Sequence, residues 1–441
     1  MEQRRKNLTQ LFIPICLETL LYMLSGMVDT LMLSSVNDQA VGAVGTANTY
    51  IGIFIIMFSV ISSGMVAVMT QNIGAGRPGV AYQARQLGLV FNAALGVIMS
   101  LFLSLGAGTI LSGVGVADAL MQPAKTYLQI VGGFCILNAL IPICSSYLRA
   151  FGFSKEPLYA SIIGNVINFC LNAFFLFVLH KGVAGVATAT VISRIINLVI
   201  VVLLGAVLVK AKQHPERESN RAVMGQIIRI GLPSACETAI YNVSMTLVIR
   251  FLNQMDAQGL NVTARSYTMQ ITNFSYCVGA ALAQANAIMT GWRIGAKEYD
   301  ACDRGTRKAA IIGVIVAVIL ETMFALCSGW IMQLFSKDPQ MVSLVGKLLA
   351  IDIVLEMGRV TNLVYGQALK TSGDAVFPVV MGACFMILCS VGGTYLFGIR
   401  LGLLAVGAYI GMAGDECVRA VGMYLRWKSG KWKEKGLVKS R

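Results

Sequence analysis

Residues 148–157 read LRAFGFSKEP, and residues 369–378, 221 positions later, read LKTSGDAVFP. Both copies hold a Leu, a basic residue, a Gly and a Pro at the same places. Two shorter segments recur at nearly the same spacing: Pro14-x-x-x-Glu18-Thr19 returns as Pro233-x-x-x-Glu237-Thr238, and Ile73-Gly74-Ala75 returns as Ile294-Gly295-Ala296. Anchors that keep one order and one spacing indicate a duplicated unit of about 200 residues.

The composition places this duplication in a membrane. The chain of 441 residues is 56% hydrophobic and only 13% charged, whereas about a quarter of the residues of a soluble domain are charged. Its mean hydropathy is +0.71. The net charge of +14 lies in short connections and tails rather than on one face of a soluble domain, which argues against nucleic-acid binding. Almost all of the eleven cysteines fall in apolar segments, so no disulfide framework is predicted.

Twelve segments are apolar and long enough to cross a bilayer, which takes about 20 residues of helix. They cover residues 8–34, 42–70, 86–112, 124–149, 157–179, 183–209, 227–252, 262–289, 308–335, 343–370, 376–399 and 401–425. We expect an N-terminal half at 1–210, a cytoplasmic linker at 211–225, a C-terminal half at 226–425 and a basic cytoplasmic tail at 426–441. The predicted fold is an all-α integral membrane protein with two six-helix halves around a central cavity, an architecture typical of transporters.

The distribution of Lys and Arg predicts the orientation in the membrane. Basic residues crowd the connections on one side, among them Arg4, Arg5, Arg293 and Arg304, and the segment 426–441. The opposing loops at 34–41 and 111–123 contain no Lys or Arg. Because basic loops stay inside the cell, we expect both termini in the cytoplasm. Six helices per half then make the two halves parallel, in a multi-pass protein of the cell (plasma) membrane.

Motifs along the whole chain point to one family of transporters. The first helix carries Val28-Asp29-Thr30, the repeated Leu-Arg/Lys-x-x-Gly motif follows the fourth and tenth helices, and Gly182-Val-Ala-Gly185 enters the sixth. Together they resemble the multidrug and toxic compound extrusion (MATE) family, which implies cation-coupled export of amphipathic, often cationic, small molecules. The major facilitators also have two parallel six-helix halves. They carry an acidic–basic motif between helices two and three that the loop QNIGAGRPG at 71–79 lacks.

A candidate cation site lies in the N-terminal half. The rise per residue places Asp29 in the outer half of the first helix, with Asn172 and Thr190 at similar depth on the fifth and sixth helices. Asn168 lies one turn from Asn172 on the same face. The resemblance implies that this neighbourhood binds the coupling ion, and we expect Asp29 to take up H⁺ or Na⁺ from outside and so drive substrate release. Many relatives have an aspartate where Asn172 stands, and an amide cannot titrate, so the stoichiometry of coupling stays open.

The repeated Pro and Glu of the first anchor allow two interpretations. Pro14 is expected to let the first helix bend. Glu18 shares a helix face with Asp29 and recurs as Glu237 in the second half. Either each acid has a role in transport, or the two are polar contacts retained from the duplication.

The C-terminal half holds further carboxylates within its apolar segments, at Glu237, Glu321, Asp352, Glu356, Asp415 and Glu416. Arg419 follows the last two by four and three residues, a spacing that favours ion pairs along one helix. Arg359 follows Glu356 by three and could neutralise it in the same way. For Glu237, Asp352 and Glu356, a second cation site or a site for cationic substrate is the other possibility.

The leading function is a secondary active exporter of amphipathic, cationic small molecules that works by alternating access coupled to inward H⁺ or Na⁺ flow. The alternative is a flippase for lipid-linked oligosaccharide or another amphipathic lipid on the same superfold. Such proteins often have basic residues in the cavity, whereas Arg194 is the main unassigned base here. No enzyme motif, metal-ligand cluster or phosphate-binding loop is found. We therefore expect no cofactor and no metal beyond Na⁺, and as partners the substrate, the ion and the bilayer, with no nucleic acid and a monomeric chain.

Overall fold

The computed structural model of the protein describes residues 6–34, 38–113, 116, 118–210, 216–256, 258–333 and 335–438. Throughout these ranges the regular structure is helical, as the predicted all-α fold requires. Arg4, Arg5, residues 211–215 of the predicted linker and residues 439–441 of the predicted tail lie outside the described residues, as do parts of the loops at 34–41 and 111–123.

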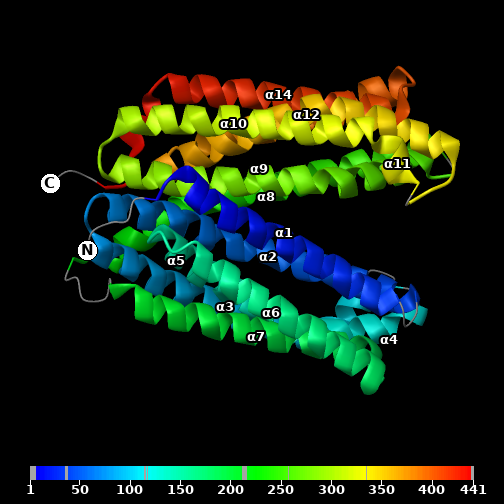
Figure 1. Cartoon of the computed structure of the whole chain (residues 1–441), viewed down its shortest axis with the longest axis horizontal. Helices are drawn as coiled ribbons and strands as arrows, with labels where there is room; N and C mark the ends of the chain where they lie inside the picture. Colours follow the sequence, from blue (N-terminus) through cyan, green and yellow to red (C-terminus); the bar gives the residue numbers. More distant parts are fainter. Residues whose placement is uncertain are drawn as a thin grey trace. The chain divides into compact units, whose positions relative to one another are not determined.

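Packing divides the chain into two compact units, Met1–Gly231 and Leu232–Arg441. The division falls inside one long helix, a few residues after the predicted start of the second half at 226. In Figure 1, α1 to α7 belong to the first unit and α9 to α14 to the second.

The N-terminal unit is a bundle of six long helical segments within its described residues. They are α1 (Leu8–Ser34), α2 (Asp38–Gly74), α3 (Pro78–Gly113), α4 (Asp118–Tyr127) continued through the π-helical turn Leu128–Gly132 into α5 (Ile136–Ala150), α6 (Lys155–Ala173) with the π-helical turn Phe174–Val178, and α7 (Gly182–Leu208). Pro14 lies inside α1, which is one continuous helix.

The C-terminal unit repeats this plan from α8 onward. Its helices are α8 (Asn220–Met255), α9 (Leu260–Gly295), α10 (Tyr299–Leu326), the short α11 (Ser328–Met332), α12 (Pro339–Ser372), α13 (Val376–Phe385) with the π-helical turns Met386–Val391 and Thr394–Arg400, α14 (Leu404–Lys428), and a 3₁₀ turn at Lys431–Lys435. Each of the twelve predicted spans coincides with one long helical segment of the described chain.

Only some of these helices are apolar enough to be recognised as membrane spans by composition. In the described part of the chain, seven pass a test of length and hydropathy, or eight if the bent pair α4–α5 counts as one span. The other long helices, α8, α9, α12 and α14, all belong at least in part to the C-terminal unit. The buried charges of α12 and α14 include Asp352, Glu356 and Asp415, none more than 2% exposed.

Two of the three repeated sequence anchors lie at the C-terminal ends of helices. After α5, the amide of Phe153 donates to the carbonyl of Leu148, and after α12 the amide of Asp374 donates to that of Leu369, each at 2.9 Å. Gly152 and Gly373 have φ of +87° and +98°, the left-handed conformation that this type of cap needs. Two further left-handed residues, Gly76 and Lys297, follow the Ile-Gly-Ala anchors. The duplication has therefore kept the points at which helices end.

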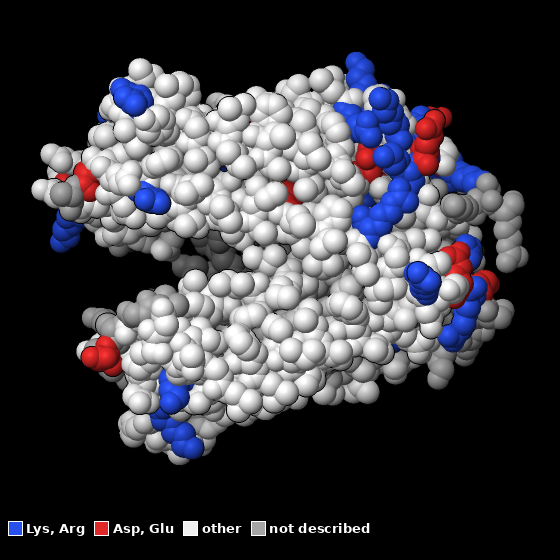
Figure 2. Space-filling model, turned by 180° about the vertical axis from the view of Figure 1, so that it is seen from behind, with Lys and Arg blue, Asp and Glu red and all other residues white. Residues whose placement is uncertain are grey.

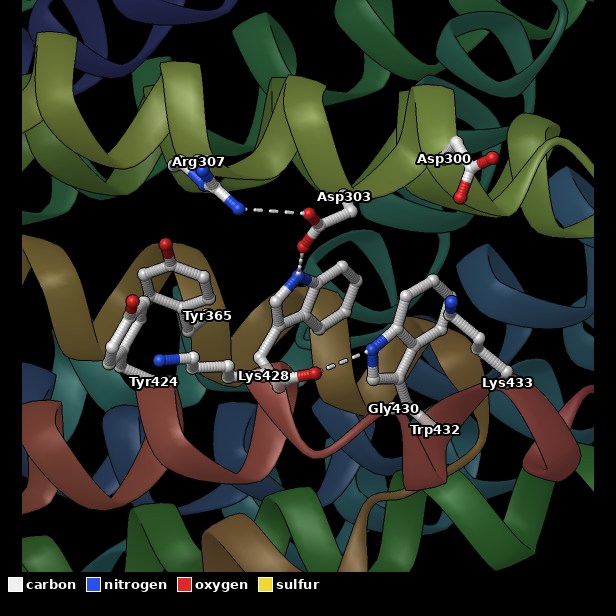
Figure 3. Close-up of a pocket in the computed structure, with 10 residues that line it drawn as sticks. Asp300, Asp303, Arg307, Tyr365, Tyr424, Lys428, Gly430, Trp432 and Lys433 are labelled. Carbon is white, nitrogen blue, oxygen red and sulfur yellow. Dashed lines mark hydrogen bonds and ion pairs between the residues drawn. The ribbon is translucent and has the colours of Figure 1, made fainter.

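The segment predicted as a basic tail packs onto the C-terminal unit as far as it is described. Trp432 stacks on Trp427 with ring centroids 4.1 Å apart, and both are buried. The indole of Trp427 donates to Asp303 of α10 at 2.8 Å. These side chains line a pocket of about 230 Å³ together with Tyr365 and Tyr424 (Figure 3). The first three residues of the predicted tail belong to α14, which ends at Lys428.

Gly373→Ala is expected to destabilise the C-terminal unit. A left-handed conformation costs an L-residue about 1–2 kcal/mol, and an added Cβ would collide with the carbonyl oxygen of Lys435 in the C-terminal segment. Gly76→Ala is the matched control, because its φ is +75° but nothing lies within 4 Å of the added Cβ. Thermal unfolding of the purified protein should show the larger loss for Gly373→Ala. Equal losses would contradict the packing of the C-terminal segment on this cap.

Candidate functional site

The predicted N-terminal cation site is partly assembled around Asp29. Asn172 donates from Nδ2 to Oδ1 of Asp29 at 2.6 Å and to Oδ1 of Asn168 at 3.2 Å. Asp29 is half-buried, while Asn168 and Asn172 are 5% and 0% exposed. Thr190 is buried, but its hydroxyl donates to the carbonyl of Val186 in its own helix at 2.9 Å. Hydrogen bonds thus join Asp29 to Asn172 and Asn172 to Asn168, while Thr190 is bonded within α7.

Two groups that the sequence did not assign to this site also act on Asp29. Arg194, one turn beyond Thr190 on α7, lies within electrostatic range of its carboxylate. Tyr127, at the end of α4, interacts with the charges of both Asp29 and Arg194. Oδ1 of Asn172 has no hydrogen-bond partner among the described residues. The arrangement offers a carboxylate and amide oxygens, the donor set that hard cations prefer, with a base nearby.

The repeated acids Glu18 and Glu237 pair with the repeated basic residues. In the N-terminal unit, Glu18 of α1 lies 2.5 Å from Arg149 at the end of α5. In the C-terminal unit, Glu237 of α8 lies 2.5 Å from Lys370 at the end of α12. Each pair ties the first helix of a repeat to the C-cap of its fourth span. This geometry favours the interpretation of Glu18 and Glu237 as contacts retained from the duplication.

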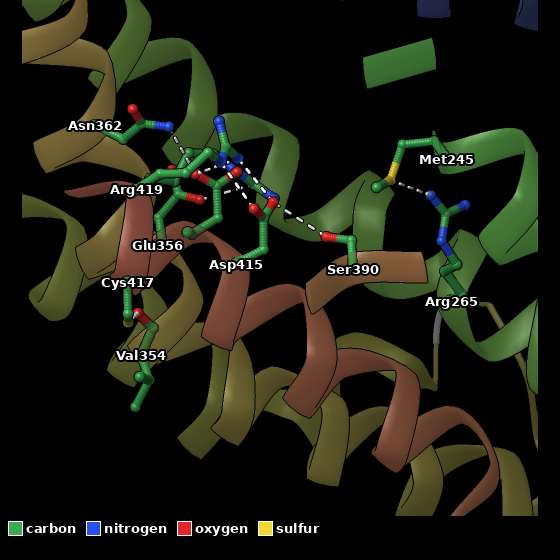
Figure 4. Close-up of polar contacts among 11 residues, drawn as sticks. Met245, Arg265, Val354, Glu356, Asn362, Ser390, Asp415, Cys417 and Arg419 are labelled. Carbon is green, nitrogen blue, oxygen red and sulfur yellow. Dashed lines mark hydrogen bonds and ion pairs between the residues drawn. The ribbon is translucent and has the colours of Figure 1, made fainter. Parts of the chain in front are cut away.

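The C-terminal unit contains a network of ion pairs between α12 and α14 (Figure 4). Arg419 donates to both oxygens of Asp415 at 2.9 Å and lies 2.9 Å from Glu416. Arg359 lies 2.9 Å from Glu356 and 3.5 Å from Glu416. Asn362 donates to Glu416 and Ser390 to Asp415. The arginines follow the acids of their own helices at the spacing seen in the sequence, and Arg359 links α12 to α14.

Asp352 and Glu356 do not form one bonded cluster with Glu237, because Glu237 pairs with Lys370. Their neighbour is instead Glu321 of α10, whose charge interacts with both of them. Both oxygens of Glu321, Oδ2 of Asp352 and Oε1 of Glu356 have no hydrogen-bond partner among the described residues. The sequence showed Glu321 as a single acid in an apolar helix, and only the packing of α10 against α12 brings it to this group.

Buried carboxylates held inside a bundle of bent and continuous membrane helices define a multi-pass membrane transporter rather than an enzyme. Comparison with known proteins identifies the family. The MatE family model matches residues 14–174 and 233–396, and its two matches begin at the repeated prolines Pro14 and Pro233. The chain belongs to the MatE family of multidrug efflux transporters, as its motifs predicted.

Related transporters match this chain over nearly its whole length. The uncharacterized transporter YisQ of Bacillus subtilis is 33% identical over 431 residues, which cover 96% of this chain and 94% of that protein. The probable multidrug resistance protein NorM of Thermotoga maritima is 24% identical over 446 residues, 98% and 94% of the two chains.

Solved structures share the fold at lower identity. A crystal structure of MATE in the bent conformation has a TM-score of 0.88 at 18% identity, covering 97% of this chain and 96% of that one. The outward-facing conformation of a multidrug resistance MATE family transporter gives 0.86 at 18% identity, covering 98% and 96%. These likenesses confirm the predicted all-α membrane fold.

Glu18→Gln is expected to destabilise the N-terminal unit, because it leaves the guanidinium of Arg149 without its carboxylate. Both side chains are largely buried, at 14% and 11% exposed, and breaking such a pair costs on the order of 3 kcal/mol. The control is Glu218→Gln, which breaks the more open pair with Arg77, 28% exposed on both sides, and should cost about 1 kcal/mol or less. Thermal unfolding checks the order, and a loss no larger than that of Glu218→Gln would refute the structural role of Glu18.

Proposed function

We propose that this protein exports amphipathic, cationic small molecules by alternating access, coupled to inward flow of H⁺ or Na⁺. The observation that carries the proposal is Asp29, a carboxylate on a membrane helix bonded to the amide of Asn172 rather than to a basic residue. A carboxylate held in this way can accept a proton or a small cation. The relative NorM, named a probable multidrug resistance protein, supports drug-like cargo.

The coupling step is a change in what Asp29 can bond. As a carboxylate it accepts the hydrogen bond from Nδ2 of Asn172. A proton on the acid, or a Na⁺ held with the carbonyl oxygens of Asn168 and Asn172, removes or redirects that bond and cancels the attraction to Arg194. Either event changes the forces among α1, α6 and α7, which is where a conformational step would begin.

The proposed orientation places both termini in the cytoplasm of the cell and the repeats parallel. Figure 2 shows Lys and Arg gathered toward the ends of the helices, with few charges over their middle. Basic residues at one end of the C-terminal unit include Arg293, Arg304, Arg307 and Arg426. Their concentration on one side favours that side as cytoplasmic. We propose the same end for the linker and for the C-terminal segment.

Cationic cargo is supported by the acids buried in the helices of the C-terminal unit. Asp352 and Glu356 lie within it with oxygens that no described residue hydrogen-bonds. A buried region of negative charge attracts cations and repels anions. A flippase for lipid-linked pyrophosphates would need the opposite charge.

Asp29→Asn is expected to reduce ion-driven export on the order of tenfold or more, because the amide cannot exchange a proton or neutralise Na⁺. The assay is uptake of a cationic dye into everted membrane vesicles under separately imposed H⁺ and Na⁺ gradients. Asp256→Asn is the control, since Asp256 caps the start of α9 through the amides of Leu260 and Asn261. Export by Asp29→Asn equal to that of the parent across pH and Na⁺ series would sink the assignment. No movement of any dye by the parent would favour the lipid flippase.

Asn172→Asp is expected to make export depend more steeply on the coupling ion. The new carboxylate would stand within hydrogen-bonding distance of Asp29, and two like charges at that separation need a shared proton or cation. Asn172→Ala separates this effect from loss of the hydrogen bond. Initial export rates measured across a pH or Na⁺ series give the slope, and identical slopes for the parent and Asn172→Asp would be contrary to a site at Asp29.

A further inference from the structure

The buried charges of the C-terminal unit do not balance. Five carboxylates within the long helices of this unit, those of Glu321, Asp352, Glu356, Asp415 and Glu416, are each no more than 5% exposed. Arg359 and Arg419 pair with three of them, Glu356, Asp415 and Glu416. A further base, Arg265 of α9, is buried; it contacts the sulfur of Met245 at 3.7 Å and forms no ion pair with a described acid. Glu321 and Asp352 are thus left without a basic partner in contact.

Glu321 is the most completely isolated of these acids. It is 0% exposed, and neither of its oxygens has a hydrogen-bond partner among the described residues. Ser275 on α9 is 1% exposed, and its hydroxyl likewise meets no hydrogen-bond criterion with a described residue. The hydroxyl lies close enough to Glu321 to interact with its carboxylate. A charged Glu321 would leave at least one carboxylate oxygen without a donor in this dry core, whereas a protonated Glu321 could itself donate to the Ser275 hydroxyl oxygen.

The charged groups around Glu321 come from one neighbouring helix. α10 packs against α9, α11 and α12. α12 contributes the carboxylates of Asp352 and Glu356 and the guanidinium of Arg359, α9 contributes the hydroxyl of Ser275, and α11 has no ionisable residue. The other charges of α10 lie at its opposite end, the nearest being Lys308, about 20 Å away at the rise of a helix.

We propose that Glu321 is a proton-binding residue and forms, with Asp352, a second proton site in the membrane core of the C-terminal unit. This inference rests on the proposed ion-driven export and names H⁺ as the ion of this unit. A proton is favoured over a metal ion because the guanidinium of Arg359 lies within electrostatic range of Glu321 and would repel a metal cation, whereas a proton forms a covalent bond with the carboxylate. A carboxyl group without a partner in a low-dielectric core is most stable in its neutral form.

Binding and release of the proton at Glu321 would affect the ion-pair network between α12 and α14. On uptake, one oxygen of Glu321 becomes an O–H that donates to Ser275 or to the carboxylate of Asp352. On release, the proton leaves and the oxygen is again a charged acceptor. The restored negative charge then repels Glu356, whose partner Arg359 also lies 3.5 Å from Glu416 of α14. Protonation of Glu321 thereby biases the contact between α12 and α14.

The test uses the full-length protein in lipid membranes and does not depend on transport. Infrared difference spectroscopy across a pH titration detects the carbonyl band of protonated carboxylic acids. We expect the parent to show such a band at neutral pH, and Glu321→Gln to lose one component of it. Asp374→Asn is the matched control, because Asp374 is 2% exposed but paired with Arg426 and Lys435. An unchanged band and titration in Glu321→Gln would overturn the proposal.

A second measurement guards against a misfolded variant. If the folded parent holds more protons than the unfolded chain, its stability falls as pH rises. The melting temperature of the parent should therefore drop more between neutral and alkaline pH than that of Glu321→Gln, and parallel pH profiles would overturn the proposal.

The vesicle assay separates the two hypotheses. Loss of the infrared component in Glu321→Gln while Asp29→Asn exports normally would support the second site and remove Asp29 from the coupling mechanism. An unchanged infrared band in Glu321→Gln, together with loss of ion-dependent export in Asp29→Asn, would support Asp29 as the coupling residue and overturn the proton site at Glu321.

Discussion

A charge inside a bilayer must find a partner or be neutralised, and that constraint organises this structure. Glu18 meets Arg149, Glu237 meets Lys370, and Arg359 and Arg419 hold three acids of α12 and α14. Each of these pairs is formed within one unit. A unit that compensates its own charge can move as one body without breaking an ion pair, which is what the proposed alternating access requires.

The duplication has preserved structure and varied chemistry. The repeated Leu-Arg/Lys-x-x-Gly motif ends a helix in both units, and its basic residue forms an ion pair with the repeated Glu. Those positions are retained because backbone conformation and a buried ion pair both depend on them. Outside them, the N-terminal unit has Asp29 beside asparagines, whereas the C-terminal unit has five buried acids within its long helices. The scaffold and the proposed ion sites have therefore been free to change separately.

Patterns along the chain predicted contacts between residues of one helix and contacts between residues at the same depth in the membrane. Twelve apolar segments gave the helices, and the common depth of Asp29 and Asn172 led to a real hydrogen bond. Depth alone does not fix rotation about a helix axis, which is why Thr190 is bonded within α7 instead. The predicted second site at Glu237, Asp352 and Glu356 stays a prediction, and the structure adds that Glu237 pairs with Lys370, a pairing that the recurrence of Glu and Arg/Lys at nearly one spacing also indicates.

Contacts between distant helices could not be predicted in this way. Glu321 is the only acid in the apolar segment 308–335, and only the packing of α9 and α12 around it shows that its oxygens are unpaired among the described residues. The composition of the C-terminal segment indicated a basic cytoplasmic tail. In the structure, buried Trp427 donates to Asp303 and its neighbour Arg426 pairs with Asp374, both more than fifty residues earlier in the chain.

The difference between the two units has a consequence for coupling. In the N-terminal unit, the described hydrogen bonds join Asn172 to one carboxylate, that of Asp29, so the proposed site can exchange at most one charge. In the C-terminal unit three acids share two arginines, and two further acids have no base in contact. Such a surplus is stable in a low dielectric only when protons or a cationic substrate offset it. A cation entering this unit would therefore compete with bound protons for the same negative charge. That competition would couple release of the cationic substrate to binding of protons, without direct contact between substrate and protons.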